Sequence, residues 1–106
     1  MSRAKSFSFG VFTDAHVTAF DGVTDSPFNV NSLSNYRYAA AIQMINKFNL
    51  DFALNLGDMN HPLPQSPDYR LAAKRYHEIT NDLNCNHYCI PGNHDIGDKP
   101  SKLVPA

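Results

Sequence analysis

Runs of basic residues and long apolar runs are both missing from this sequence of 106 residues. Nine basic residues stand against ten acidic ones, and their spread along the chain gives no electrostatic footprint for nucleic acid or an anionic membrane. No apolar stretch approaches the roughly 20 residues that a membrane-spanning helix needs. The start, Met1-Ser2-Arg3-Ala4-Lys5, is not followed by the continuous apolar segment and small-residue cleavage site of a signal peptide. We therefore expect a soluble, cytoplasmic protein without a nucleic-acid or membrane partner.

Cysteine is scarce, and a glycine-rich phosphate loop is missing. Cys85 and Cys89 are separated by three residues, which matches neither a redox pair nor a zinc knuckle. We expect buried, reduced thiols that act as small hydrophobic residues, with a disulfide or an incidental metal contact as alternatives. The turn after the first predicted strand is Thr13-Asp14-Ala15-His16, so a Rossmann-type nucleotide site, which needs glycines there, is disfavoured.

Hydrophobic periodicity predicts one α/β domain, or part of one, over residues 1–106, built as a βαβαβ unit with a parallel sheet. Strands are expected at residues 6–13, 51–56 and 86–90, where β-forming and apolar residues gather. Apolar residues at three- and four-residue spacings predict an amphipathic helix at 35–48, with Phe48 in its apolar stripe. A second helix is expected to begin with Ser66 as N-cap and Pro67 at the first position.

Residues 17–35 are predicted to form a loop, because Gly, Pro, Asp, Asn and Ser are packed closely along them. Connections longer than about 12 to 15 residues in a compact domain are usually functional or mobile. Two interpretations stay open: a loop that borders the site and shapes substrate choice, or a variable surface loop. The charged face of the second helix, which includes Arg75, is expected to be solvated.

Metal-ligand residue types follow each of the three predicted strands. Asp14-x-His16 follows the first, Gly57-Asp58-x-x-His61 the second, and Gly92-Asn93-His94-Asp95 the third. Ligands of open α/β sheets bind beyond the carboxyl ends of the strands, so we expect the three segments to meet. If the first strand continues, Asp14 and His16 point to the same side. Carboxylate, imidazole and amide groups suit Mn²⁺, Fe²⁺, Zn²⁺ or Mg²⁺, and Asp58 can bridge two ions with its two oxygens.

Asp-x-His, Gly-Asp-x-x-His and Gly-Asn-His-Asp, in this order and each after a strand, resemble the motifs of the calcineurin-like metallophosphoesterases. The resemblance implies the N-terminal half of an α/β sandwich with a dinuclear metal centre. The implied roles are Asp14 and His16 on the first metal, Asp58 as the bridge, Asn93 on the second metal, His94 as the catalytic imidazole and Asp95 as the residue that orients it. His61 stands where the family has various polar residues and is a further candidate ligand.

The implied activity is hydrolysis of a phosphate ester. Two cations clamp the phosphate and activate a hydroxide that attacks phosphorus in line, while an imidazole protonates the leaving alkoxide. The motifs leave the substrate open among phosphomonoesters, phosphodiesters, cyclic nucleotides and diphosphates, with diesters favoured by the resemblance.

The family completes both metal sites with further histidines from a later half, and no such motif follows Asp95. His77 and His87, the histidines outside the motifs, are expected to be structural or on the surface. We therefore expect a truncated half with an incomplete second metal site and exposed sheet edges, which the missing C-terminal half or a homo-oligomer would cover. The alternative, from another class, is a non-catalytic α/β binding or assembly module in which the Asp and His residues form turns and caps.

Overall fold

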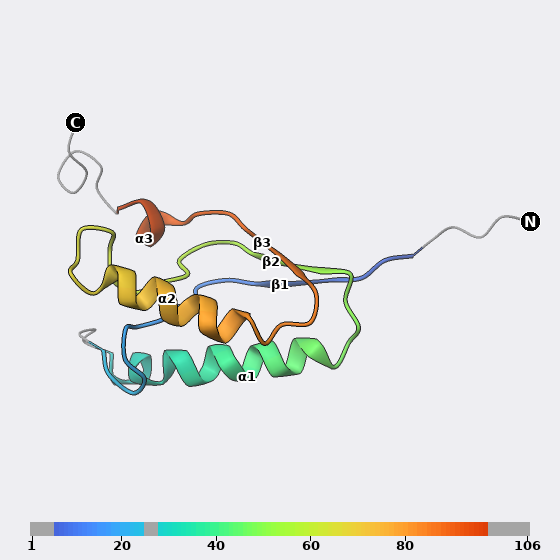
Figure 1. Ribbon diagram of the computed structural model, residues 1–106, viewed down its shortest axis with the longest axis horizontal. Coiled ribbons are helices and arrows are strands. Elements are labelled where there is room, and N and C mark those ends of the chain that lie inside the picture. The colour runs from blue at the N-terminus through green and yellow to red at the C-terminus, as the bar shows by residue number, and fades with distance from the viewer. Residues whose placement is uncertain (1–5, 25–27, 98–106) are drawn as a thin grey trace, which may run out of the picture.

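The computed structural model describes residues 6–24 and 28–97, which form a three-stranded parallel sheet and two long helices (Figure 1). The elements are β1 (Phe9–Phe12), the 3₁₀ helix η1 (Asn29–Leu33), α1 (Ser34–Asn46), β2 (Phe52–Asn55), α2 (Tyr69–Thr80), β3 (Asn86–Cys89) and the short α3 (Asn93–Ile96). The strand order is β1-β2-β3, and Phe52 of β2 stands opposite Phe9 on one side and Asn86 on the other. The predicted βαβαβ unit with a parallel sheet is confirmed.

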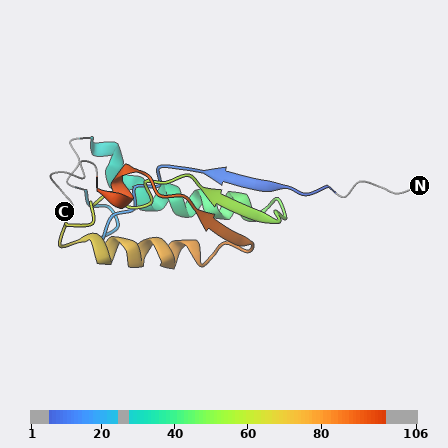
Figure 2. The ribbon, with the colours of Figure 1, turned by 90° about the horizontal axis from the view of Figure 1, so that it is seen from above.

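Helices α1 and α2 lie on the same face of the sheet (Figures 1 and 2). Two successive crossovers of one hand, moving in one direction across the sheet, produce this arrangement. A buried apolar cluster lies between this face and the helices and consists of Val17, Tyr38, Ile42, Tyr76 and Ile79. The rings of Tyr38 and Tyr76 stack with their centroids 5.2 Å apart, which joins α1 to α2. None of the described helices is long and apolar enough to cross a membrane.

The opposite face of the sheet is not covered by any helix in the part of the chain that the structure describes (Figure 1). Because side chains alternate along a strand, this face carries the apolar residues Phe7, Phe9, Val11, Phe52, Leu54, Leu56, Tyr88 and Ile90. The rings of Phe9 and Phe52 stack on it at 5.1 Å. Phe7 is 68% exposed and Tyr88 55% exposed, although parallel sheets are normally buried on both faces.

The predicted helix boundaries are wrong by two residues, about half a turn, at two places. Helix α1 ends at Asn46, and Phe48 is 67% exposed and does not contribute to the apolar stripe. Helix α2 begins at Tyr69, two residues later than predicted, because Ser66 takes part in a separate turn. The Tyr69 amide donates to the Ser66 carbonyl at 3.1 Å, and the Ser66 hydroxyl accepts from the Asp68 amide at 3.3 Å. The tail at 101–106, predicted to lack periodic structure, lies outside the described residues.

The predicted loop 17–35 is partly helical, since residues 29–33 form η1 and the last two residues belong to α1. Its first part is fixed by Asn35, which is 1% exposed. The Asn35 side chain accepts from the Thr18 amide at 2.9 Å and donates to the Thr18 carbonyl at 3.1 Å. It also donates to the Asp21 carboxylate at 2.7 Å. The start of the loop is therefore held against α1; residues 25–27 lie outside the description.

The charged face of α2 was predicted to be solvated. Arg75 on that face instead forms an ion pair. Its guanidinium donates to both oxygens of Asp21, each at 2.8 Å. The hydrogen bond from Arg75, together with that from Asn35, holds the pKa of Asp21 below its usual value. The ion pair ties the loop to α2, and both side chains are 32% exposed.

The two cysteines are free, as expected, but the prediction that they are buried is wrong. Cys85 is half-buried and Cys89 is exposed. Burial raises the pKa of the Cys85 thiol. The reason for the error lies in the position of Cys89 on β3, which is a strand at the edge of the sheet.

Candidate metal centre

The segments that follow β1 and β2 are joined by backbone hydrogen bonds beyond the ends of the strands. The amide of Asp14 donates to the carbonyl of Gly57 at 3.0 Å, and the amide of His16 donates to the carbonyl of Asp58 at 3.0 Å. The parallel pairing then resumes in an isolated bridge between Val17 and Asn60. Pairing therefore aligns the Asp-x-His segment with the Gly-Asp segment, residue by residue.

Left-handed backbone conformations turn the candidate ligands toward one another. The φ angles are 57° at Asp14, 48° at His16 and 54° at Asp58, and Asn49 is the one other non-glycine residue with positive φ in the described chain. Such conformations cost free energy for residues with a Cβ and gather at functional sites. The condition under which an extended strand would place Asp14 and His16 on one side is not met, because β1 ends at Phe12. The turn, not the strand, brings the two side chains together.

The first group of donors consists of Asp14, His16 and Asp58, whose ligand atoms all lie within 4.8 Å of one another. His16 Nε2 lies 3.4 Å from Asp14 Oδ1 and 3.7 Å from Asp58 Oδ2. Asp14 is exposed, whereas His16 and Asp58 are half-buried. These are the residues that the sequence predicted for the first metal and the bridge.

Two glycines allow the Asp58 turn to lie directly against the turn after β3. A Cβ on Gly57, whose φ is 115°, would lie 2.5 Å from the amide nitrogen of Gly92, and a Cβ on Gly92 would lie 2.7 Å from that of Asp58. The close approach lets the His94 amide donate to Asp58 Oδ1 at 2.9 Å. Asp58 Oδ2 is the oxygen on the side of His16.

Asp95 holds the backbone of the site rather than the imidazole of His94. Its Oδ2 accepts from the amides of Asp58 and Gly92, both at 2.7 Å, and its Oδ1 accepts from the amide of Met59 at 3.0 Å. His94 Nδ1 instead lies 2.7 Å from the main-chain oxygen of His61. The predicted orienting role of Asp95 is therefore corrected: the carbonyl of His61 fixes the ring of His94.

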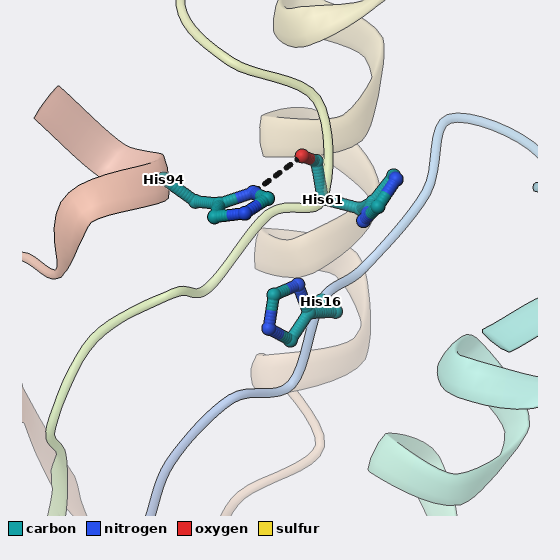
Figure 3. A group of neighbouring side chains, drawn as sticks. All are labelled: His16, His61 and His94. Carbon is teal, nitrogen blue, oxygen red and sulfur yellow. Dashed lines mark hydrogen bonds between the residues drawn. The ribbon is translucent and has the colours of Figure 1, made fainter. Parts of the chain in front are cut away.

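A second group of donors consists of His16, His61 and His94, again with ligand atoms within 4.8 Å of one another (Figure 3). The structure thus places His61, a further candidate in the sequence, at the same site. Asn93 begins α3 directly before His94, and its side chain is exposed. Its place in a second metal site stays a prediction.

Sequence reasoning missed Asn55 and Tyr76 as residues that support the site. Asn55 is fully buried; its Oδ1 accepts from the Gly57 amide at 2.9 Å, and its Nδ2 donates to the Tyr76 hydroxyl at 2.9 Å. That hydroxyl also lies 2.9 Å from Nε2 of His87, which makes His87 a structural histidine. An asparagine within the apolar strand Phe-Ala-Leu-Asn was the available signal, because a buried amide needs partners.

The donors present fit a divalent metal ion. Two carboxylates and an imidazole form a hard to borderline set that suits Mn²⁺, Fe²⁺ or Zn²⁺. His16 Nε2 is the nitrogen that faces the two carboxylates, whereas His16 Nδ1 is buried without a hydrogen-bond partner among the described residues. The donor set has the chemistry of a metal centre and lies at the carboxyl ends of a parallel sheet, where the ligands of such sheets bind.

Comparison with known proteins agrees with this geometry. The sequence model of the calcineurin-like phosphoesterase family matches residues 7–105, which include all three motif segments. A search of curated proteins finds no match. Since the family match spans nearly the whole chain, the chain belongs to the calcineurin-like phosphoesterase family, whose members are metal-dependent phosphoesterases.

Proposed function

We propose that this chain carries the metal-binding half of a phosphoric ester hydrolase, with Asp14 and His16 on the first metal and Asp58 as the bridge to a second. The observation that carries the proposal is the convergence of these three donors within 4.8 Å, each from a residue with a left-handed backbone. Asn93 would contribute to the second ion, whose ligand set is incomplete with the residues of this chain. The proposal rests on family membership and on this donor geometry.

Divalent ions at this site would neutralise charge on a bound phosphate and make a water molecule more acidic. The chain's own contribution to proton transfer would come from His94. Because the His94 Nδ1–H donates to the carbonyl of His61 at 2.7 Å, Nε2 is the nitrogen left to exchange a proton with substrate. An imidazole positioned in this way would protonate the leaving alkoxide and raise the rate by about 10² to 10⁴-fold.

A cavity of about 310 Å³ beside His94 would receive part of the substrate. Its lining residues are His61, Pro62, Leu63, Gln65, Ser66 and His94. A smaller cavity of about 170 Å³ adjoins it through His61, Pro62 and Ser66 and includes Phe20 and Val23 from the loop 17–35. This placement supports the interpretation in which that loop shapes substrate choice. Two adjoining cavities on one side of the metal ligands suit an ester with a substituent beyond the phosphate, and we propose phosphodiesters before monoesters.

The test is turnover of chromogenic aryl phosphate mono- and diesters in Mn²⁺ by the wild-type chain and by Asp58→Asn, His94→Ala and His77→Ala variants. We expect hydrolysis by the wild type, its loss in Asp58→Asn, and a fall of about 10² to 10⁴-fold in His94→Ala. His77→Ala is the matched control, because His77 is an exposed histidine on α2. Equal rates for the wild type and Asp58→Asn would contradict the proposal. Metal-dependent stabilisation without turnover would place activity in a completed domain, and neither signal would favour the non-catalytic module.

We further propose that the uncovered face of the sheet is covered by a second copy of this chain. Six of its side chains are 46% to 68% exposed. If a fully exposed side chain of this size has roughly 150 to 200 Å² of surface, the exposed parts of the six add up to about 500 to 600 Å². A standard interface buries about 800 Å² per partner, and in homodimers about 65% of that is apolar, or roughly 520 Å². The exposed area is thus sufficient for a stable interface. The cytoplasmic location and the assignment as a partial domain stay predictions.

Analytical ultracentrifugation tests this proposal. A dimer that Val11→Lys converts to a monomer would identify a second copy, because Val11 is half-exposed on this face. A monomer that binds a hydrophobic dye would show that the face is exposed and would contradict its burial against a second copy. A monomer that binds no dye would contradict an exposed apolar face.

A further inference from the structure

Three imidazoles from three different segments gather beside the carboxylates of the site (Figure 3). The ring centroids of His16 and His94 are 4.9 Å apart, those of His61 and His94 are 5.6 Å apart, and those of His16 and His61 are 5.8 Å apart. All three histidines are half-buried, and one ring nitrogen of each lies within 4.8 Å of the others. The arrangement places three ring-nitrogen donors around one point.

The backbones that carry these rings are held in place by the fold. The His61 amide donates to the Val17 carbonyl at 2.9 Å, and the His16 amide donates to the Asp58 carbonyl at 3.0 Å. The His94 amide donates to Asp58 Oδ1 at 2.9 Å. The three histidines are therefore fixed through hydrogen bonds of their backbone amides, two to carbonyls and one to the Asp58 side chain.

Two of the rings have the environment of metal ligands. Imidazoles that bind metals usually donate their second ring N–H to a carbonyl or carboxylate, which fixes the ring and its tautomer. His94 makes such a bond, because its Nδ1 lies 2.7 Å from the carbonyl oxygen of His61. His16 Nδ1 is buried without a hydrogen-bond partner among the described residues, and a bound ion would satisfy it.

We propose that His16, His61 and His94 form a site for one zinc-class transition ion, distinct from the carboxylate group of Asp14, His16 and Asp58. Three imidazoles with an open fourth position are a tetrahedral zinc arrangement, whereas Mn²⁺ and Mg²⁺ prefer carboxylates. Around a tetrahedral ion with Zn–N bonds near 2.0 to 2.1 Å, the nitrogens are about 3.4 Å apart. The nitrogens, which lie within 4.8 Å of one another, would reach that spacing by rotation of the side chains when the ion binds.

Because His16 belongs to both donor groups, metal binding to the three histidines competes with metal binding to the carboxylate group. An ion on the three histidines takes His16 from the carboxylate group and takes Nε2 of His94 out of proton transfer. This consequence rests on the proposed function: Zn²⁺ in excess would suppress ester hydrolysis that Mn²⁺ supports. The metal-binding proposal itself does not depend on hydrolysis.

The first test is a Co²⁺ titration of the intact chain, followed by the visible absorption of tetrahedral Co²⁺, with Mn²⁺ binding measured in parallel by electron paramagnetic resonance. The variants are His61→Asn, Asp58→Asn and the control His77→Asn. His61→Asn removes the side-chain donor and leaves the carbonyl that holds His94. Because loss of even an outer partner of a ligand costs about 10- to 100-fold in metal affinity, we expect His61→Asn to weaken Co²⁺ binding at least tenfold and to leave Mn²⁺ binding unchanged. Asp58→Asn should weaken Mn²⁺ binding and retain tetrahedral Co²⁺, and His77→Asn should behave as the wild type.

A second measurement uses the unmodified chain, so that it does not depend on a variant that folds. Long-range ¹H–¹⁵N spectra of the imidazoles recorded with one equivalent of Zn²⁺ should show shifts for His16, His61 and His94 and none for His77. Equal Co²⁺ affinity in the wild type and His61→Asn, an octahedral Co²⁺ spectrum, or Zn²⁺ shifts that leave out His61 would overturn the proposal. If the wild type hydrolyses esters in Mn²⁺ but shows no tetrahedral Co²⁺, this inference fails and the proposed function stands. If tetrahedral Co²⁺ forms but Mn²⁺ neither stabilises the chain nor supports ester hydrolysis, this inference stands and the proposed function fails.

Discussion

Replacement of Asp95 should loosen the metal site through the backbone and not through His94. Its carboxylate accepts three amide hydrogen bonds, at 2.7, 2.7 and 3.0 Å, which join the turn of α3 to the Asp58 turn. Hydrogen bonds to a charged acceptor contribute about 1.5 to 3 kcal/mol each. Because Asp95 is only part-buried, we take the low end, so Asp95→Ala should destabilise the fold by about 3 to 5 kcal/mol. Asp95→Asn keeps one oxygen and should cost about 1 to 2 kcal/mol.

These values translate into a clear order in thermal unfolding. For a domain of this size, 1 kcal/mol corresponds to a shift of about 4 to 8 °C in the midpoint. We expect the wild type to melt highest, Asp95→Asn next and Asp95→Ala lowest, in circular dichroism melts with and without Mn²⁺. Since the carboxylate supports the Asp58 turn, Mn²⁺ affinity should fall about 10- to 100-fold in Asp95→Ala.

The reasoning would be refuted by Asp95→Ala protein that melts like the wild type and binds Mn²⁺ equally well. The orientation of the His94 ring provides a further check. With the carbonyl of His61 holding Nδ1 of His94, we expect the ring to keep its orientation in a crystal structure of Asp95→Asn.

Three further changes test the supports of the site. Gly92→Ala places a Cβ 2.7 Å from the Asp58 amide nitrogen and should cost about 1 to 3 kcal/mol by overpacking, with weaker Mn²⁺ binding by calorimetry; unchanged affinity would contradict the close approach. Arg75→Ala should lose about 1 kcal/mol near neutral pH. Because Arg75 lowers the pKa of Asp21, the contribution is present above about pH 3.9 and lost as pH falls through the folded pKa, so melts of the wild type and Arg75→Ala should converge in acid. Burial, with the charge of the neighbouring His77, lowers the pKa of His87, so the free energy of unfolding should decline as pH falls below about 6.5. His87→Gln should remove this part of the dependence of stability on pH, and a dependence that persists in His87→Gln would assign it to another group.

The order and type of the main elements could be predicted because their signals are local. Alternation in residues 6–13 and the apolar runs before Gly57 and Pro91 are sufficient to place three strands, and two helical stripes lie between them. Helix ends were less predictable, because Ser66 can cap a helix or close the turn that precedes it. The structure has the turn, with the Tyr69 amide bonded to the Ser66 carbonyl.

The candidate ligands could be named from the sequence because metal chemistry restricts residue types. How the ligands meet could not be predicted, since it depends on left-handed conformations at Asp14, His16 and Asp58 that local preference disfavours. The hydrogen-bond partners of Asp95 could not be predicted from the sequence either. Its carboxylate bonds to amides up to 37 positions away in the sequence, and no periodicity records such a contact.

The supporting pair Asn55 and Tyr76 shows the same limit. Tyr76 lies on α2, and its ring is buried. Its hydroxyl, however, joins Asn55 to His87 across the sheet. An alternating or helical pattern predicts which side chains are buried, but not where their polar atoms find partners.

The measurement that tests the central claim most directly is an anomalous difference map from crystals of the chain grown or soaked in Mn²⁺. The account predicts a Mn²⁺ peak at the carboxyl ends of β1 and β2, with carboxylate oxygens of Asp14 and Asp58 and a nitrogen of His16 as its ligands. Crystals of Asp58→Asn treated in the same way should show a weaker peak or none. A Mn²⁺ peak elsewhere, or full occupancy of the site in Asp58→Asn, would contradict the account.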